Sequence, residues 1–452
     1  MGQVMRMDGA ARFGLVGMLT VLVCGLAGSG WAHEGVETEP ESDTKVEELE
    51  EKVDVLAEEM GRLKAIFAVP EDLELTSFSG LGPAASKVYK RASGLSIGGY
   101  GEVRLRGHVN EGDNDSDDIF DALRAVVYVG YKFNENWVVN SEFEIEHGGS
   151  GGDGSVSTEF LTIDYLHRDE VNARVGLLLI PMGFVNEIHE PTFYYGAERP
   201  EVERVILPST WRENGAGVFG TISERIHYRA YAVNGFKGED FSSAGLRGGR
   251  QKGSKAIAND FAFVMRVDVD VVDGLLLGGS FYTGQTGQEQ SVVSANAGGV
   301  EVDLPDARLN LYEVHAQYKG YGLSLRALWT QAFLNQAGKL SRDTDQALNA
   351  AIASRMKGFY VEAGYDVLPL IWPETKASLE PYFRFEKYDT QDRVQDAALG
   401  YTPDQSKDID LYVAGLQFKP IPQVVFKVDY RRFNPNKGRG DDQIQGLVGY
   451  VF

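Results

Sequence analysis

Residues 95–106, which read LSIGGYGEVRLR, alternate between apolar and polar side chains. Leu95, Ile97 and Leu105 share one parity, whereas the charged residues Arg104 and Arg106 share the other. Successive side chains of a β-strand point to opposite faces, so this pattern predicts a strand with one apolar face and one polar face. A basic side chain that faces lipid at the bilayer midplane costs about 2–4 kcal/mol. We therefore expect the apolar face to meet lipid and the charged face to meet water.

The same alternation continues to the end of the chain. An even number of strands of roughly ten residues is typical of bacterial single-chain barrels. Links after even-numbered strands are mostly short, and links after odd-numbered strands are long and polar, which predicts periplasmic turns and external loops. A soluble β-sandwich would not sort its links in this way. We predict an antiparallel outer-membrane β-barrel at residues 94–452, of about sixteen strands, at residues 94–108, 119–133, 136–147, 157–167, 172–180, 215–222, 226–236, 259–271, 274–284, 307–318, 322–333, 357–367, 377–388, 409–418, 423–433 and 443–452.

The N-terminus has the features of a targeting segment. Arg6 and Arg12 flank the start of an apolar run at residues 13–27, and small residues precede a cleavage point after Ala32. These features predict a signal peptide at residues 1–32, Sec-type export and localisation in the bacterial outer membrane. An uncleaved anchor is the alternative, but the apolar run is shorter than the roughly 20 residues that cross a bilayer. The single cysteine, Cys24, would leave with the signal peptide, so we expect no disulfide.

A heptad pattern follows an acidic linker at residues 33–44. Over residues 45–69, apolar side chains recur alternately three and four positions apart, at Val46, Leu49, Val53, Leu56, Met60, Leu63 and Phe67. This spacing predicts a short coiled-coil helix in the periplasm, and a second linker at residues 70–93 then leads to the barrel. The alternative is a monomeric amphipathic helix packed on the barrel. Self-association would favour a homotrimer.

Residues 181–214 form the longest departure from alternation. Loops of more than about 15 residues are usually functional or disordered, and this segment is too aromatic for a disordered one. We predict that it folds into the barrel and narrows the pore. The alternative is that many of its charged residues pair and fasten the loop to the wall. The predicted constriction residues are His189, Glu190, Arg199, Glu201, Glu203, Arg204, Arg212 and Glu213.

Inward positions of the predicted strands carry both signs of charge. Acids and bases on different sectors of the wall would create a field across the pore that tunes ion selectivity, but the sign of that selectivity stays open. The predicted pore-lining residues are Arg104, Arg106, Arg124, Glu142, Glu144, Arg174, Arg229, Arg326 and Arg384.

Composition and motifs argue against other classes of protein. A net charge of −22 argues against nucleic acid as a partner. The sequence contains neither a G-x-S-x-G nor an H-E-x-x-H motif, so we expect no enzyme, no cofactor and no metal centre. The acidic loop at residues 113–118 resembles the start of a calcium loop, but it lacks the glycine and glutamate that such a loop requires.

The last strand and the long loop carry a resemblance to known proteins. Tyr450 and the terminal Phe452 resemble the signal that outer-membrane proteins present to the barrel-assembly machinery. The stretches GLLLIPMGFVNEIHEP, ERPEVE and LPSTWRENGAGVFG, between Gly176 and Gly220, resemble the phosphate-selective porin O/P family of outer-membrane porins. The resemblance implies a trimer, a loop inside the barrel and diffusion of small anions such as phosphate, or of other solutes.

The sequence therefore predicts an outer-membrane porin, surrounded by lipid and lipopolysaccharide, through which small hydrophilic solutes or ions diffuse passively. A structural anchor that links the envelope through the coiled coil is the alternative function.

Overall fold

The computed structural model of the protein describes residues 48–60, 75–110, 117–395 and 399–452. The chain divides into two compact units, residues 1–67 and residues 68–452. The predicted signal peptide, the acidic linker at residues 33–44 and residues 113–116 of the calcium-like loop lie outside the described residues.

The described part of the first unit is a helix at residues 48–60. It confirms that the heptad segment is helical over this range. Lys52 and Glu48, one turn apart, form an ion pair of 2.7 Å on its surface. Leu49, Val53 and Leu56 of the apolar seam are all exposed. The coiled coil itself stays a prediction.

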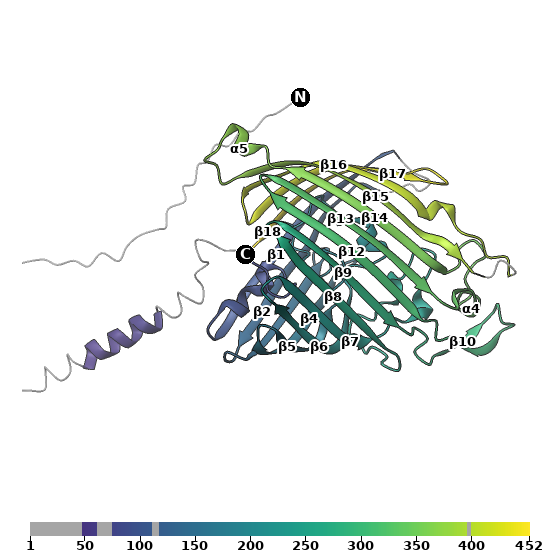
Figure 1. The fold of residues 1–452 in the computed structure, drawn as a ribbon, viewed down its shortest axis with the longest axis horizontal. Coiled ribbons are helices and arrows are strands. Elements are labelled where there is room, and N and C mark those ends of the chain that lie inside the picture. The colour runs from purple at the N-terminus through teal and green to yellow at the C-terminus, as the bar shows by residue number, and fades with distance from the viewer. Residues whose placement is uncertain (1–47, 61–74, 111–116, 396–398) are drawn as a thin grey trace, which may run out of the picture. The chain divides into compact units, whose positions relative to one another are not determined.

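Residues of the second unit form a closed antiparallel barrel, as predicted (Figure 1). Sixteen of the described strands close it, and β18 pairs with β1 from Tyr100↔Val451 onward. The barrel strands are β1 Gly94–Asn110, β2 Ile119–Lys132, β3 Trp137–Glu146, β4 Ser155–Arg168, β5 Val171–Leu179, β6 Arg212–Ile222, β7 Ile226–Asn234, β8 Phe261–Val272, β9 Leu275–Gly284, β12 Leu309–Gly320, β13 Leu323–Leu334, β14 Ala353–Tyr365, β15 Ser378–Val394, β16 Asp408–Ile421, β17 Val424–Pro435 and β18 Asp442–Val451. No described helix is long and apolar enough to cross a bilayer.

The two rims of the barrel differ as the sequence predicts. One rim, the short-turn rim, has tight links such as residues 133–136, and its longest link carries α5 Leu368–Ile371. The other, the long-loop rim, carries the hairpin β10 Ser291–Ser294 and β11 Val300–Asp303 and the helix α4 Ala337–Asp343. Three short 3-10 helices, η2 Gly238–Asp240, η3 Arg247–Gly249 and η5 Gln405–Lys407, also lie in its loops.

Residues 180–211, the inner loop, connect β5 to β6 and contain the helix α3 Glu201–Val205. This loop packs against the inner wall, because Ala197 N donates to Asp429 of β17 and Val202 N donates to Glu386 of β15. Strand β6 begins at Arg212, so the predicted loop residues Arg212 and Glu213 belong to that strand.

Residues 75–93, the inner strap, precede β1 and lie against the inner wall. They include α2 Pro83–Ser86 and the 3-10 helix η1 Lys87–Lys90. Glycines of the wall make room for the strap: a Cβ at Gly98 would lie 2.8 Å from Ala84 O, and one at Gly130 would lie 2.8 Å from the Val88 side chain. Residues 75–93 of the segment that we expected as a linker therefore pack against the inner wall of the barrel.

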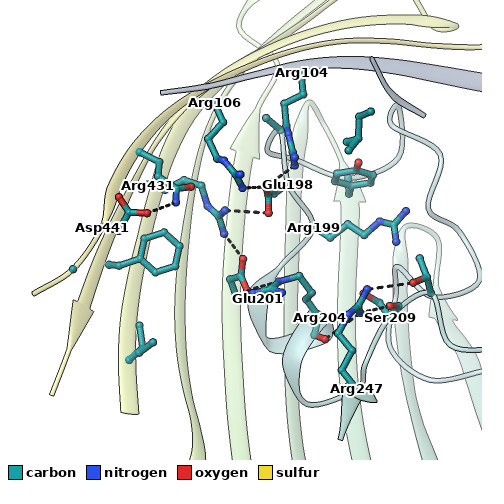
Figure 2. A pocket seen from close by; sticks show the side chains of 18 of the residues that line it. Arg104, Arg106, Glu198, Arg199, Glu201, Arg204, Ser209, Arg247, Arg431 and Asp441 are labelled. Atoms are coloured by element: carbon teal, nitrogen blue, oxygen red, sulfur yellow. Dashed lines mark hydrogen bonds and ion pairs between the residues drawn. The ribbon is translucent and has the colours of Figure 1, made fainter. Parts of the chain in front are cut away.

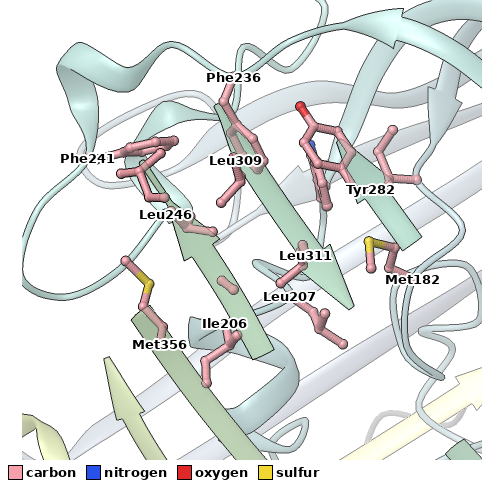
Figure 3. Close-up of a cluster of buried hydrophobic side chains, with 14 of the residues drawn as sticks. Met182, Ile206, Leu207, Phe236, Phe241, Leu246, Tyr282, Leu309, Leu311 and Met356 are labelled. Atoms are coloured by element: carbon pink, nitrogen blue, oxygen red, sulfur yellow. The ribbon is translucent and has the colours of Figure 1, made fainter. Parts of the chain in front are cut away.

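Part of the barrel interior is apolar, which the alternation did not predict (Figure 3). Met182, Ile206 and Leu207 of the inner loop pack there with Phe236 and Phe241 of the next long loop. The wall contributes inward side chains of several strands, among them Tyr231, Val264, Tyr282, Leu309, Leu311, Leu328 and Met356. The inner loop is therefore held by a hydrophobic core as well as by polar contacts.

Candidate functional site

A cavity of about 760 Å³, the vestibule, opens between the inner loop and the wall near the long-loop rim (Figure 2). Its wall comes from β1, β2, β3, β16, β17 and β18, and its floor comes from residues 194–210 of the inner loop. The charged lining residues comprise nine Lys or Arg and five Asp or Glu: Arg104, Arg106, Arg124, Arg199, Arg204, Arg247, Arg431, Lys437, Arg439, Glu102, Glu146, Glu198, Glu201 and Asp441.

Two glutamates of the inner loop anchor the basic residues of the vestibule. Arg104 and Arg106 of β1 both approach Glu198, and Arg431 Nη1 lies 3.3 Å from its Oε2. Arg431 Nη2 also lies 2.8 Å from Glu201 Oε1, and Arg204 holds the other oxygen of Glu201 at 2.6 Å. Burial acts to raise the pKa of Glu201, but the two guanidinium groups lower it to about 2. Both glutamates are therefore occupied by arginines.

Arg199 and Arg247 lack such carboxylate partners. Arg199 makes no hydrogen bond or ion pair with the described residues. Arg247 Nη1 donates to the neutral Ser209 O at 2.6 Å, and burial together with the charge of Arg250 lowers the pKa of Arg247 to about 9. This side of the vestibule therefore holds positive charge that the protein does not neutralise.

Two further cavities lie toward the short-turn rim. The exit cavity, of about 360 Å³, has four basic and two acidic lining residues: Lys319, Arg326, Lys376, Lys419, Glu362 and Glu380. The side cavity, of about 400 Å³, reaches the inner strap at Ser77 and Gly80. It also has four basic and two acidic lining residues: Arg229, Arg266, Lys319, Arg326, Glu187 and Asp268.

The vestibule and the exit cavity meet at Tyr194, which lines both. Tyr194 Oη donates to Glu102 Oε2 of β1 at 3.3 Å. Lys427 of β17 lies on the other side, with its Nζ 3.9 Å from the centre of the Tyr194 ring. At this residue the inner loop therefore lies against the sector of the wall formed by β1, β18 and β17.

An uncharacterized protein of Aquifex aeolicus (strain VF5) is 34% identical to this chain over 402 residues, which cover 86% of this chain and 87% of that protein. The chain belongs to the same family as that protein. No family model matches the chain.

Solved structures of outer-membrane proteins share the fold of this family member. A loop-deletion mutant of OmpT, an outer membrane protein of Vibrio cholerae, is 12% identical with a TM-score of 0.50, and the match covers 80% of this chain and 100% of that one. The outer membrane channel DcaP of Acinetobacter baumannii is 11% identical with a TM-score of 0.50, and the match covers 80% and 98% of the two chains. The fold is that of a porin-like barrel.

The eight predicted constriction residues occupy two kinds of place in the structure. Arg199, Glu201 and Arg204 line the vestibule. The other five brace the loop, the strap and the wall. His189 Nε2 lies 3.0 Å from Glu142 Oε1 of β3, and Glu190 Oε1 accepts from Ala84 N of the inner strap at 3.0 Å.

The remaining braces are Glu203, Arg212 and Glu213. Glu203 accepts from Tyr360 Oη at 2.7 Å and from Val185 N at 2.8 Å. Arg212 pairs with Glu159 of β4 at 2.6 Å. Glu213 accepts from Asn234 Nδ2 of β7 at 2.6 Å. These contacts match the alternative in which such residues fasten the loop and the start of β6 to the wall.

The nine predicted lining residues also fall into two groups, those that line a cavity and those that do not. Arg104, Arg106 and Arg124 line the vestibule, and Arg229 and Arg326 line the cavities near the short-turn rim. The other four line none of these cavities and belong to buried ion pairs: Glu142–His189, Glu144–Arg124, Arg174–Asp164 and Arg384–Glu362. Two of the partners, Arg124 and Glu362, do line a cavity. Acids and bases are interleaved in these pairs and are not separated by sector.

Sequence reasoning did not select Tyr194, Glu198 or Arg247, and it gave Lys427 and Arg431 only as inward charges of the wall. Lys427 and Arg431 lie at inward positions of the alternation in β17, so the sequence predicts that their side chains face the barrel interior. It does not predict their contacts with the inner loop, because those partners lie about 230 positions away in the sequence.

Two other expectations concern metal and assembly. Among the described residues, no group of His, Cys, Asp and Glu could hold a metal ion. Tyr450 and Phe452 lie on the outer face at the end of the barrel, where their rings stack at 6.4 Å, and Phe452 N donates to Gly99 O at 2.8 Å. Their role as an assembly signal stays a prediction.

Proposed function

We propose that the protein is a porin of the bacterial outer membrane through which small hydrophilic anions diffuse passively. The observation that carries this proposal is the charge of the cavities. Basic residues outnumber acidic ones by nine to five in the vestibule and by four to two in each of the other cavities. The whole chain has the opposite sign, with a net charge of −22.

The excess of positive charge lies where a solute would travel. Cavities lined by one sign of charge, with low-dielectric walls, concentrate ions of the other sign. Rings of Arg and Lys are the usual device of pores that favour anions. In this proposal the long-loop rim faces outward, so the vestibule collects anions from the outside and passes them toward the periplasm.

The test is a measurement of ion selectivity on the full chain, purified and inserted in a planar bilayer. We expect stepwise currents and a reversal potential in a KCl gradient that shows chloride to be more permeant than potassium. Phosphate added to one side should reduce the chloride current more than an uncharged sugar does. Insertion without stepwise current, or a preference for potassium, would reject the proposal.

The finer assignment to the phosphate-selective porin O/P family is part of this proposal. It is supported by the inner loop at residues 180–211, which lies in the barrel interior as that resemblance implies. Arg199 and Arg247 would supply donors for an oxyanion such as phosphate. The proposal also places the outer face of the barrel against lipid and lipopolysaccharide.

We further propose a homotrimer joined through the N-terminal helices. The apolar side chains of Leu49, Val53, Leu56 and Met60 are between 58% and 64% exposed, so they are free to pack against other copies. The test is the mass of the full chain in detergent by light scattering. A trimeric mass that falls to a monomer in L56D supports the helices as the joint, whereas a monomeric wild type rejects the trimer.

A further inference from the structure

The place where the vestibule meets the exit cavity is built around one aromatic side chain. Tyr194 is only 4% exposed although it lines two cavities, because its ring is held on both sides. Its hydroxyl donates to Glu102, and its backbone oxygen accepts from Lys427 Nζ at 2.7 Å. Among the residues that line these two cavities, Tyr194 alone lines both.

Neighbouring residues keep the ring in place. Tyr195 stacks on Tyr382 of β15 with ring centres 4.9 Å apart, and Arg384 Nη1 donates to Tyr195 O at 3.0 Å. Ala197 N donates to Asp429 Oδ2 at 2.6 Å. The residues that follow Tyr194 in the inner loop are thus fixed to β15 and β17, which favours a rigid position for its ring.

Lys427 places its amino group at the same point without a carboxylate partner. Its Nζ donates to two neutral acceptors, Tyr194 O and Gly196 O at 3.0 Å, and lies over the Tyr194 ring. None of the described carboxylates lies within ion-pair distance of it. The nearby carboxylates already serve other donors, since Glu102 pairs with Arg124 at 2.8 Å and Asp429 accepts from Ala197. When it is protonated, a buried amino group without a carboxylate partner favours an anion beside it.

We propose that solutes pass from the vestibule to the exit cavity beside Tyr194, and that Tyr194 and Lys427 form the selectivity filter there. Tyr194 limits solute size, and Lys427, which contacts Tyr194 but lines neither cavity, sets the preference for anions through its charge. This inference rests on the proposed function and assigns its selectivity to one position. The arginines of the vestibule then serve to collect anions, and the filter decides which of them pass.

The charge of the filter is tested with K427Q and K427R in the full chain in planar bilayers. We expect K427Q to lower the chloride-to-potassium permeability ratio by about threefold or more, because a charge in a narrow, partly dry passage is weakly screened. K427R should keep the ratio of the wild type. Neither Lys427 nor Lys255 lines one of the three cavities, but Lys427 contacts Tyr194, which lines two of them. The matched control is therefore K255Q, because Lys255 is an exposed lysine on the long-loop rim, and it should leave the ratio unchanged.

The size limit is tested with Y194A and Y194F. We expect Y194A to raise single-channel conductance by about twofold and to raise the permeability of gluconate relative to chloride, because the ring no longer fills the passage. Y194F keeps the ring and should conduct as the wild type does. The oligomeric mass and heat stability of each variant show whether it is folded.

The outcomes separate the inference from the proposed function. An anion-selective wild type with an unchanged ratio in folded K427Q and unchanged conductance in folded Y194A overturns the filter and leaves the porin standing. A wild type without anion preference overturns the proposed function. A loss of selectivity in K427Q with rescue in K427R supports both.

Discussion

Toward the long-loop rim, the two halves of the barrel interior are built from the same alternating strands but differ in what lines them. The half formed by β5 to β9 and β12 to β15, the filled half, holds the apolar cluster of Figure 3. The half formed by β16 to β18 and β1 to β3, the charged half, holds the vestibule of Figure 2. Inward residues such as Tyr231 and Leu311 belong to the apolar cluster, and inward residues such as Arg104 and Arg431 line the vestibule.

The difference between the halves lies in what covers the wall. In the filled half the inner loop and its neighbouring loops cover the strands, so apolar inward residues are removed from water at about 25 cal/mol per Å² of buried surface. In the charged half the wall stays open to a cavity, and its residues carry charge. Toward the long-loop rim, the filled half therefore holds the inner loop by apolar packing, whereas the charged half holds it by ion pairs beside an open cavity.

The largest loss of stability is expected from W211A in the filled half. Trp211 is fully buried, and its ring centre lies 4.5 Å from that of Phe236 and 4.9 Å from that of Tyr282. Loss of a large buried aromatic side chain costs about 3–5 kcal/mol, so we expect W211A to lower the unfolding midpoint in urea strongly. Its control is W372A, because Trp372 is 61% exposed in a link of the short-turn rim and should cost less than about 0.5 kcal/mol. Equal midpoints for the two variants would show that the filled half does not hold the barrel together.

A second prediction concerns Glu190, which joins the inner loop to the inner strap. Its carboxylate is fully buried beside Ala84 N, and burial, with the charge of Glu142 added to it, raises the pKa of Glu190 to about 8. A raised pKa in the folded state means that this group favours folding below its ordinary pKa and loses that contribution as the pH rises through about 8. Lys87 is the nearby cation that acts against this shift.

The wild type should lose free energy of unfolding between about pH 5 and pH 9, and we expect this loss to be smaller in E190Q, by at most about 4 kcal/mol. The measurement is the urea midpoint of wild type and E190Q at both pH values. The control is E289Q, because Glu289 is exposed in another long loop and should follow the wild type. A wild type and an E190Q variant with parallel pH dependence would rule out this role for Glu190.

The sequence predicts the charged half better than the filled half, for a physical reason. The alternation in residues 95–106 predicts which side chains of β1 face inward, and Arg104 and Arg106 do line the vestibule. Local periodicity carries that information, because a strand fixes the direction of its own side chains. The parity of the links likewise predicts the two rims.

The filled half and the strap depend on contacts between distant segments. Tyr89 Oη of the strap donates to Asp164 of β4, 75 positions away, at 2.7 Å, and no local pattern marks either residue for the other. Phe236 and Leu340 join one apolar cluster from two different long loops. A polar loop with a few apolar residues gives no sign of whether it folds inward. For the same reason Glu190 could be chosen as a loop residue, but not as the partner of the strap.

The smallest effect on stability is expected in the charged half, from R199Q. Arg199 makes no hydrogen bond or ion pair with the described residues and acts on the buried Glu142 only through its charge, so we expect a change of less than about 0.5 kcal/mol. The anion preference should still fall, by about 1.5-fold at 0.1 M KCl and less at 1 M, because the screening length shortens from about 10 Å to about 3 Å. R199K should restore it. R431Q is the contrasting variant, since it removes a guanidinium that Glu198 and Glu201 share, and it should destabilise the barrel. If R199Q lowers the urea midpoint as far as R431Q does, Arg199 stabilises the fold, and the proposal that it acts on the solute is rejected. If it lowers only the anion preference, the charged half acts on the solute and not on the fold.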